Sequence, residues 1–117
     1  FNVNLLANKF KTPSYCYSYK KIKENILYFN KTFKKIKPII CFSVKANPNK
    51  IILREIRNLG LGADVVSIGE LMVALKSGIK PGKIVFSGVG KTFKEIEYAL
   101  KKKYFLLMQS QEVKFFP

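Results

Sequence analysis

The feature that most constrains the fold is a regular alternation of strand-like apolar runs with amphipathic segments. The strand-like runs are "IICFSVK" (39–45), "GADVVS" (62–67), "KIVFSG" (83–88) and "YFLLMQS" (104–110). Their last residues are Lys45, Ser67, Gly88 and Ser110, so successive ends lie 22, 21 and 22 residues apart. A repeat of this length predicts βα units, whose right-handed crossovers build a parallel sheet.

Helix signals fill the segments between these runs. Residues 50–59 carry apolar side chains at helical spacing and end at Gly60. The spacing of a capping box occurs twice, in Ser67–Glu70 and in Thr92–Glu95, and predicts a helix start at each place. Each strand-like run is therefore followed by a helix, as a βα repeat requires.

Two further patterns precede the repeat. "SYCYSY" (14–19) is aromatic and alternating, which predicts a short strand. Residues 20–35 predict an amphipathic helix, because lysines fill one face and apolar residues recur at helical spacing on the other: Ile22, Ile26, Phe29 and Phe33.

Two architectures accommodate a βα repeat, an open doubly wound sheet and a (β/α)8 barrel. No GxGxxG motif follows a strand, which argues against a dinucleotide-binding sheet. Four units amount to half of a barrel, and a complete barrel needs ~250 residues. The sequence therefore predicts an α/β fold in which residues 1–117 form the N-terminal part of a (β/α)8 TIM barrel. We expect this single partial domain to lack its first residues, the rest of the barrel and a C-terminal β domain.

The net charge is +15, from 22 Lys+Arg against 7 Asp+Glu. Such an excess is typical of proteins that bind nucleic acids or other anionic polymers. Here the basic residues are spread along the chain in short clusters such as Lys101–Lys103, without an Arg-rich arm. We therefore expect no nucleic-acid partner, and a non-catalytic basic protein that binds anionic polymers stays as the alternative.

Histidine is absent from the chain, which excludes a His-based acid, base or metal site within it, and no metal site is expected. Cys16 and Cys41 each lie in an apolar stretch without a CxxC pair, so we expect buried, reduced thiols in a cytoplasmic protein. No apolar run reaches the ~18 residues of a membrane span, and no secretory signal leads the chain.

Reactive groups of parallel α/β folds gather at the carboxyl ends of the strands, where Lys45 lies. A lysine amine walled by strand and helix can form a Schiff base with an aldehyde. Its small neighbours Ser43, Ala46 and Asn47 leave room for a flat cofactor ring. The alternative is an ordinary lysine whose amine extends into solvent.

Three other groups are expected at the same edge. Asp64 either orients a Schiff-base lysine or a substrate amine, or pairs with a nearby lysine. Ser67 and Glu70 serve first as helix caps. In "SGVGK" (87–91), two glycines and a lysine before a helix can cradle a phosphate. The segment lacks the spacing of a P-loop, so a tight βα loop that shapes the cleft is the preferred interpretation.

Three motifs in this order and register are "CFSVKANPN", "GLGADVVSIGELMVALKSGI" and "KIVFSGVGKTFKEIEYAL". Together they closely resemble the N-terminal barrel segment of the diaminopimelate decarboxylase family. Members of that family are pyridoxal-phosphate (PLP) enzymes of the alanine-racemase-like barrel fold. The resemblance extends to about residue 107 and includes "TPSYCYSY".

The resemblance implies that Lys45 holds PLP as an internal aldimine and that Asp64 lies beside this lysine, so that both bind the cofactor and take part in catalysis. It implies decarboxylation of meso-diaminopimelate to L-lysine, with the cofactor ring absorbing the electrons left by CO2. It also implies a homodimer of the full-length enzyme. Because the phosphate-binding and substrate residues of the family lie further along the chain, we expect the 117 residues alone to be inactive.

Relatives on the same barrel are the competing assignments. Alanine racemases continue "VKANAYG" after the lysine, whereas Asn47-Pro48-Asn49 follows here. Ornithine and arginine decarboxylases have a Phe-Asp-Cys-Ala-Ser-like second strand, whereas this chain has "ADVVS" (63–67). The tail "MQSQEVKFFP" (108–117) departs from the family, and we expect a truncated or frame-disturbed reading frame there.

Overall fold

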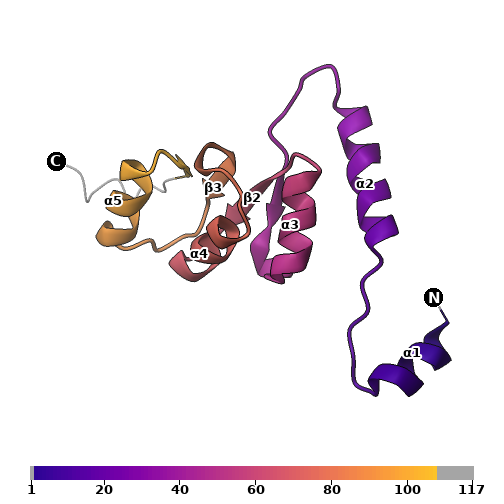
Figure 1. Ribbon diagram of the computed structural model, residues 1–117. Coiled ribbons are helices and arrows are strands. Elements are labelled where there is room, and N and C mark those ends of the chain that lie inside the picture. The colour runs from indigo at the N-terminus through magenta and orange to yellow at the C-terminus, as the bar shows by residue number, and fades with distance from the viewer. Residues whose placement is uncertain (1, 108–117) are drawn as a thin grey trace. The chain divides into compact units, whose positions relative to one another are not determined.

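The computed structural model of the protein describes residues 2–107. The chain forms two compact units, one up to Lys35 and one from Ile36 onward (Figure 1). No helix within residues 2–107 is long and apolar enough to cross a lipid bilayer.

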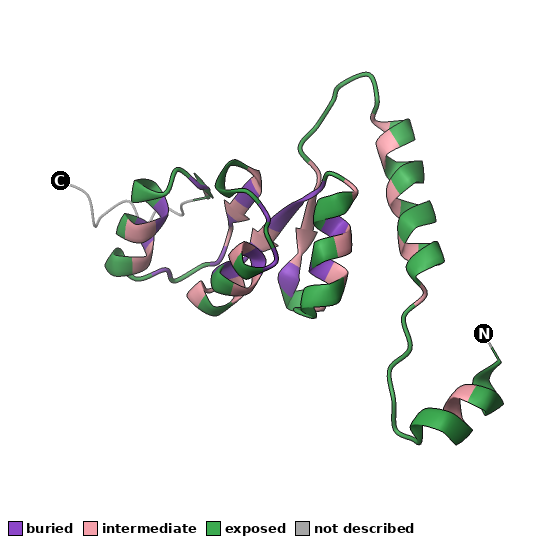
Figure 2. Cartoon of the chain, in the orientation of Figure 1, coloured by how far each residue is buried: buried purple, intermediate pink, exposed green. Residues whose placement is uncertain are grey.

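The first unit contains two helices, α1 (Val3–Phe10) and α2 (Tyr19–Thr32). Each helix begins at a side-chain cap, because the Asn2 amide oxygen accepts from the Leu5 N–H at 3.1 Å and the Ser18 hydroxyl accepts from the Lys21 N–H at 3.2 Å. Neither helix contains a buried residue, and both are exposed or half-buried along their length in Figure 2.

The prediction of a strand at residues 14–19 is wrong. Residues 14–18 have no regular secondary structure, and Tyr19 is the first residue of α2. A strand needs a partner for its backbone hydrogen bonds, and the described part of the first unit contains no strand. Ser18 instead caps a helix. The expectation that Cys16 is buried is wrong for the same reason, since its thiol is exposed.

The second unit is a parallel four-stranded sheet in the order β1-β2-β3-β4. Its strands are β1 (Cys41–Ser43), β2 (Gly62–Val65), β3 (Ile84–Phe86) and β4 (Phe105–Leu106). The crossover helices are α3 (Lys50–Asn58), α4 (Ile68–Lys76) and α5 (Phe93–Lys101). Two short 3-10 turns precede α3 and β3, namely η1 (Val44–Ala46) and η2 (Pro81–Lys83). This α/β repeat confirms the predicted fold class.

The core lies between one face of the sheet and the helices. Alternate strand residues point to opposite faces, and those on the covered face are Ala63, Val65, Ile84 and Phe86. All four are buried against apolar side chains of the helices, such as Leu53 on α3, and Figure 2 shows this buried layer in purple. Within the second unit, the crossover helices α3, α4 and α5 therefore leave the other face of the sheet uncovered.

All three crossover helices end in the same backbone arrangement. The second residue after each helix has a left-handed conformation: Gly60 (φ 86°), Gly78 (φ 85°) and Lys103 (φ 58°). The next residue is buried and donates its N–H to a carbonyl five residues back, in the pairs Leu61–Ile56, Ile79–Ala74 and Tyr104–Ala99. This repeated ending directs each chain segment back toward the sheet.

The strands are shorter than the sequence predicts, by the same amount at three ends. β1, β2 and β3 end at Ser43, Val65 and Phe86, two residues before the predicted ends Lys45, Ser67 and Gly88. The spacing of the ends is therefore preserved, while the last two residues of each run lie outside the strands. The predicted end at Ser110 lies outside the described residues.

Candidate functional site

The face of the sheet opposite α3, α4 and α5 carries a row of four side chains, of which two, Ser43 and Asp64, are polar. Ser43, Asp64, Val85 and Phe105 lie side by side through the register of the four parallel strands. None of these four side chains is fully buried in the chain. Because they share one face and lie near the carboxyl ends of their strands, they form the floor of the candidate site.

Lys45 lies two residues beyond β1, in the 3-10 turn η1. Its neighbour Val44 is fully buried and anchors the turn to the core. On the other side, Asn47 donates its N–H to the Val44 carbonyl at 3.1 Å, and the Asn47 side-chain oxygen accepts from the Asn49 N–H at 3.0 Å. The Lys45 side chain is exposed and makes no hydrogen bond or ion pair with the residues that the structure describes. The backbone is held while the amine stays available.

Asp64 is half-buried on β2 and accepts a hydrogen bond from the Ser87 hydroxyl at its Oδ1 atom. The structure thus brings together two of the residues expected at this edge. Among residues 2–107, no lysine forms an ion pair with Asp64.

Ser67 and Glu70 act as caps, as predicted, in a variant of the capping box. The Ser67 hydroxyl accepts from the Glu70 N–H at 3.2 Å, while the Glu70 carboxylate accepts from the Val66 N–H at 2.9 Å. The full capping box forms at α5, where Thr92 and Glu95 exchange hydrogen bonds in both directions.

The SGVGK segment is a tight loop, which supports the preferred interpretation. Lys91 is only 4% exposed, and its amine donates to the carbonyls of Gly88 and, at 2.6 Å, Leu107. The same amine lies 5.6 Å from the centre of the Phe86 ring. The lysine therefore closes the loop on the end of β4. Sequence reasoning missed this burial, and the two glycines just before the lysine, Gly88 and Gly90, were its signal.

The pKa of the Cys41 thiol depends in part on the charge of the Asp64 carboxylate, which lies on the same face of the sheet. Burial raises the pKa of the Cys41 thiol, and the Asp64 carboxylate raises it further, while the Lys83 ammonium opposes them. The Cys41 side chain is half-buried, with its sulfur 3.8 Å from the Lys83 carbonyl. The expectation of a buried thiol is therefore met only in part at this position.

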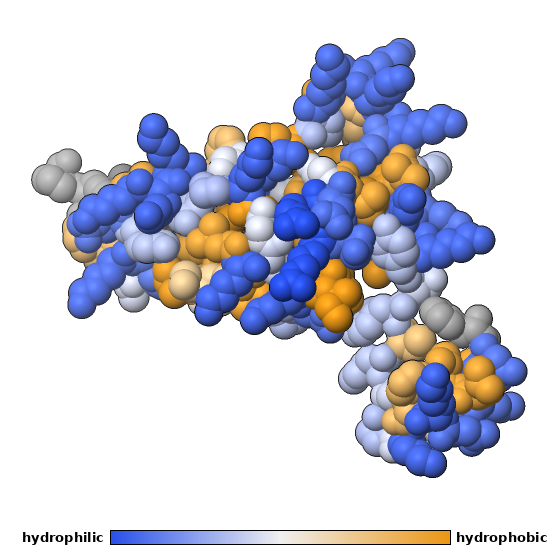
Figure 3. Space-filling model, in the orientation of Figure 1, coloured by the Kyte–Doolittle hydropathy of each residue, from blue (hydrophilic) through white to orange (hydrophobic). Residues whose placement is uncertain are grey.

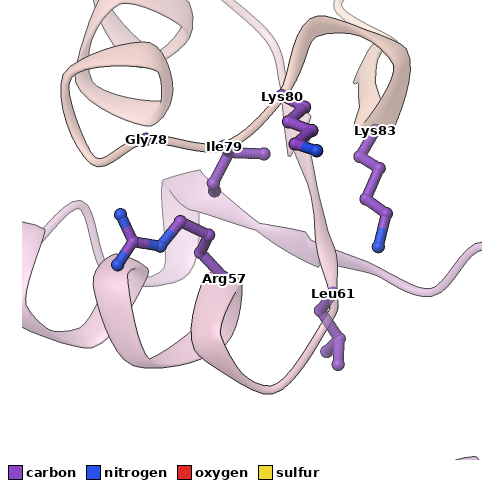
Figure 4. A pocket seen from close by; sticks show the side chains of 6 residues that line it. All are labelled: Arg57, Leu61, Gly78, Ile79, Lys80 and Lys83. Carbon is purple, nitrogen blue, oxygen red and sulfur yellow. The ribbon is translucent and has the colours of Figure 1, made fainter.

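A hollow of about 160 Å³ lies at the opposite end of the strands (Figure 4). It is lined by Arg57, Leu61, Gly78, Ile79, Lys80 and Lys83, which precede β2 and β3. In the close-up, Lys80 and Lys83 extend side by side while the guanidinium of Arg57 points away from them. Hydrophilic residues cover much of the surface seen in Figure 3, interspersed with apolar patches. This hollow contains none of the predicted site residues.

A family model described as "Pyridoxal-dependent decarboxylase, pyridoxal binding domain" matches residues 19–113. The chain belongs to this family. It is 55% identical over 101 residues to a diaminopimelate decarboxylase of Helicobacter pylori, covering 86% of this chain and 25% of that protein. The chain thus spans about a quarter of the length of the curated relatives it matches.

Solved structures show the same relationship. The diaminopimelate decarboxylase of Helicobacter pylori, as an I148L mutant complexed with L-lysine, matches with a TM-score of 0.88 and 50% identity, over 97% of this chain and 29% of that one. An ornithine decarboxylase of Entamoeba histolytica matches with a TM-score of 0.60 and 26% identity, over 78% of this chain and 29% of that one. The four βα units therefore correspond to the first part of a pyridoxal-binding barrel.

The residues of the site fit part of the pyridoxal-binding requirement of the family. PLP is an aldehyde, and Lys45 offers an exposed primary amine on a fixed turn. The neighbouring sheet face supplies a carboxylate and a hydroxyl in Asp64 and Ser87. The donor set therefore suits the aldehyde end of the cofactor.

Proposed function

We propose that this chain supplies the first part of the PLP-binding barrel of a diaminopimelate decarboxylase, which converts meso-diaminopimelate to L-lysine and CO2. The observation that carries the proposal is the 55% identity over 101 residues, which contain Lys45 and Asp64. The likeness to an ornithine decarboxylase is weaker, at 26% identity, so that alternative is not favoured.

In this proposal, Lys45 and Asp64 are the catalytic and cofactor-binding residues of the chain. The Lys45 amine is the group that would hold the cofactor through its aldehyde and that would give up this place to the substrate amine. The Asp64 carboxylate accepts a hydrogen bond from the amine that occupies this position and keeps it oriented. When bound, PLP supplies the electron sink that makes loss of the α-carboxylate possible.

We include in the proposal that the complete enzyme is a cytoplasmic homodimer, a point supported by the resemblance to the family, and that its phosphate-binding residues lie outside this chain.

A chimera tests the activity. Residues 19–107 replace the matching segment of the Helicobacter pylori enzyme, and release of L-lysine from meso-diaminopimelate is measured. We expect an active chimera that loses activity by at least about a thousandfold in Lys45→Ala, because the covalent attachment is lost. The matched control is Lys50→Ala, an exposed lysine at the start of α3, which leaves the rate unchanged. Undiminished activity in Lys45→Ala contradicts the assignment.

The alternative of a basic polymer-binding protein predicts a different outcome. The full chain would bind DNA with an affinity that falls steeply with salt concentration, since each neutralised phosphate releases counterions. PLP would then label the many lysines of the chain without preference for Lys45. Selective labelling of Lys45, read by peptide mass after borohydride reduction, excludes this alternative.

A further inference from the structure

The Asp64 carboxylate has a defined partner that the family assignment does not supply. Its Oδ1 atom accepts the hydroxyl hydrogen of Ser87, which lies just after the neighbouring strand β3. An ionised carboxylate has two oxygens and acts only as an acceptor. With one oxygen bound by Ser87, the second remains for a donor on the same face of the sheet.

Ser87 is itself fixed by its backbone. Its N–H donates to the Val65 carbonyl at 3.0 Å and so continues the pairing between β2 and β3 by one residue. This bond holds the Ser87 backbone next to the end of the strand that carries Asp64. The hydroxyl therefore reaches Asp64 from a backbone that cannot shift independently of β2.

The residues after Ser87 hold it from the other side. A Cβ atom on Gly88 would lie 2.3 Å from the Val66 carbonyl oxygen, so the loop passes directly against the backbone that follows β2. The buried amine of Lys91 then ties the Gly88 carbonyl to the Leu107 carbonyl beyond β4. The loop is therefore fastened to both neighbouring strands, and Ser87 lies at its fixed start.

We propose that Ser87 is a positioning residue, whose hydroxyl holds one oxygen of the Asp64 carboxylate so that the other oxygen stays oriented for the amine that binds PLP. This role rests on the proposed function, because it gives Asp64 a task at the Lys45 amine. Ser87 does not itself contact the reacting atoms and acts through Asp64. Loss of the hydroxyl lets the carboxylate rotate, which weakens the orientation of the amine.

The test is a mutant cycle in the full chain with PLP as the probe. The variants are Ser87→Ala, Ser87→Thr, Asp64→Asn and the double variant Ser87→Ala/Asp64→Asn. The measured quantity is the rate at which PLP labels Lys45 under borohydride reduction, followed by peptide mass over a neutral-to-alkaline pH series. Ser77→Ala is the matched control, because this buried serine donates to the Val73 carbonyl at 2.8 Å at the end of α4.

We expect Ser87→Ala to slow labelling of Lys45 about tenfold and to shift the pH at which the rate is half-maximal, on the scale of one hydrogen bond to a charged group. Ser87→Thr keeps the hydroxyl and restores both quantities. Ser77→Ala leaves them as in the wild type. In the Asp64→Asn background, Ser87→Ala produces no further change, because its effect passes through Asp64.

Each other outcome has a defined meaning. If Ser87→Ala leaves the rate and its pH profile unchanged, or if its effect multiplies with that of Asp64→Asn, the role of Ser87 is refuted. If the wild-type chain shows no selective labelling of Lys45, the proposed function of Lys45 fails and this role fails with it. A variant that loses its far-ultraviolet circular dichroism is measured instead in the chimera, where an unchanged kcat for Ser87→Ala also refutes the role.

Discussion

The two compact units of the chain are built from similar lysine-rich sequence, yet they differ in what they bury. All fourteen buried apolar residues of the described chain lie in the second unit, and none lies in α1 or α2 (Figure 2). All seven glycines also lie in the second unit, between residues 60 and 90. Helices with side-chain caps form in both units. A hydrophobic core forms only in the second unit, because only there do apolar faces of helices pack against an apolar face of a sheet.

The largest expected effect is the difference in stability loss between the same Leu→Ala substitution made in each of the two units. Leu53 on α3 is 0% exposed, whereas Leu27 on α2 is 50% exposed. We expect Leu53→Ala to lower the free energy of unfolding by about 2–5 kcal/mol, because it leaves a cavity in the core. Leu27→Ala should cost less than about 1 kcal/mol. Urea denaturation followed by circular dichroism measures both, and equal losses would show that α2 is packed as tightly as α3.

The second effect probes the close approaches that only the second unit contains. Gly88→Ala brings a Cβ atom into the backbone at Val66, and we expect it to destabilise the sheet by about 1–3 kcal/mol. Gly82→Ala is the control, since nothing lies within 4 Å of a Cβ atom there, and it should stay within about 0.5 kcal/mol. The same denaturation experiment applies, and a stable Gly88→Ala variant would mean that the loop can move away from β2.

The third prediction uses the two cysteines, one in each unit. Cys16 is exposed, whereas Cys41 is half-buried and its pKa is raised by burial and by Asp64. A raised pKa leaves less thiolate at neutral pH, so we expect a thiol reagent to modify Cys41 about tenfold or more slowly than Cys16. Variants with a single cysteine assign the two rates. Asp64→Asn should speed modification of Cys41 and leave Cys16 unchanged, because only Cys41 lies near that charge.

The smallest effect concerns helix ends that have a lysine in a left-handed conformation. Lys103 follows α5 with φ 58°, where α3 and α4 have glycine, and Lys11 follows α1 with φ 66°. We expect Lys103→Gly to raise the stability of the sheet by up to about 1 kcal/mol, because glycine adopts this conformation without strain. Lys11→Gly should leave unfolding of the sheet unchanged. A loss of stability in Lys103→Gly, measured by urea denaturation, would show that its side chain contributes more than its backbone costs.

The repeat could be predicted from sequence because its signals are local. Each apolar run is a continuous segment, and the caps at Ser67 and Thr92 depend on residues within one helical turn; the structure confirms the runs as strands and the caps as helix starts. The strand at 14–19 was wrong because alternation does not show whether a partner strand exists. The helix at Val3–Phe10 was not predicted from the sequence.

The location of the candidate site at one edge of the sheet could be predicted from the sequence, whereas the contacts between its side chains could not. The spacing of strand ends placed Lys45, Asp64 and Ser87 at one edge of a sheet, and the register of β1 and β2 agrees with this. The hydrogen bond between Ser87 and Asp64 joins two residues that are 23 positions apart in the sequence. It depends on the pairing of β2 with β3, which no local sequence pattern encodes. The burial of Lys91 likewise depends on a carbonyl beyond β4, far from its own loop.

The order β1-β2-β3-β4 also has a consequence for synthesis on the ribosome. Each strand pairs with the one that precedes it in the chain, and each crossover brings the next strand back after little more than twenty residues. A growing polypeptide therefore meets the partner of every new strand already in place, with a low contact order and a small entropic cost of closure. Stepwise addition of this kind changes only one of the two free edges of the sheet, because the outer edge of β1 stays the same while each new strand is added at the opposite edge.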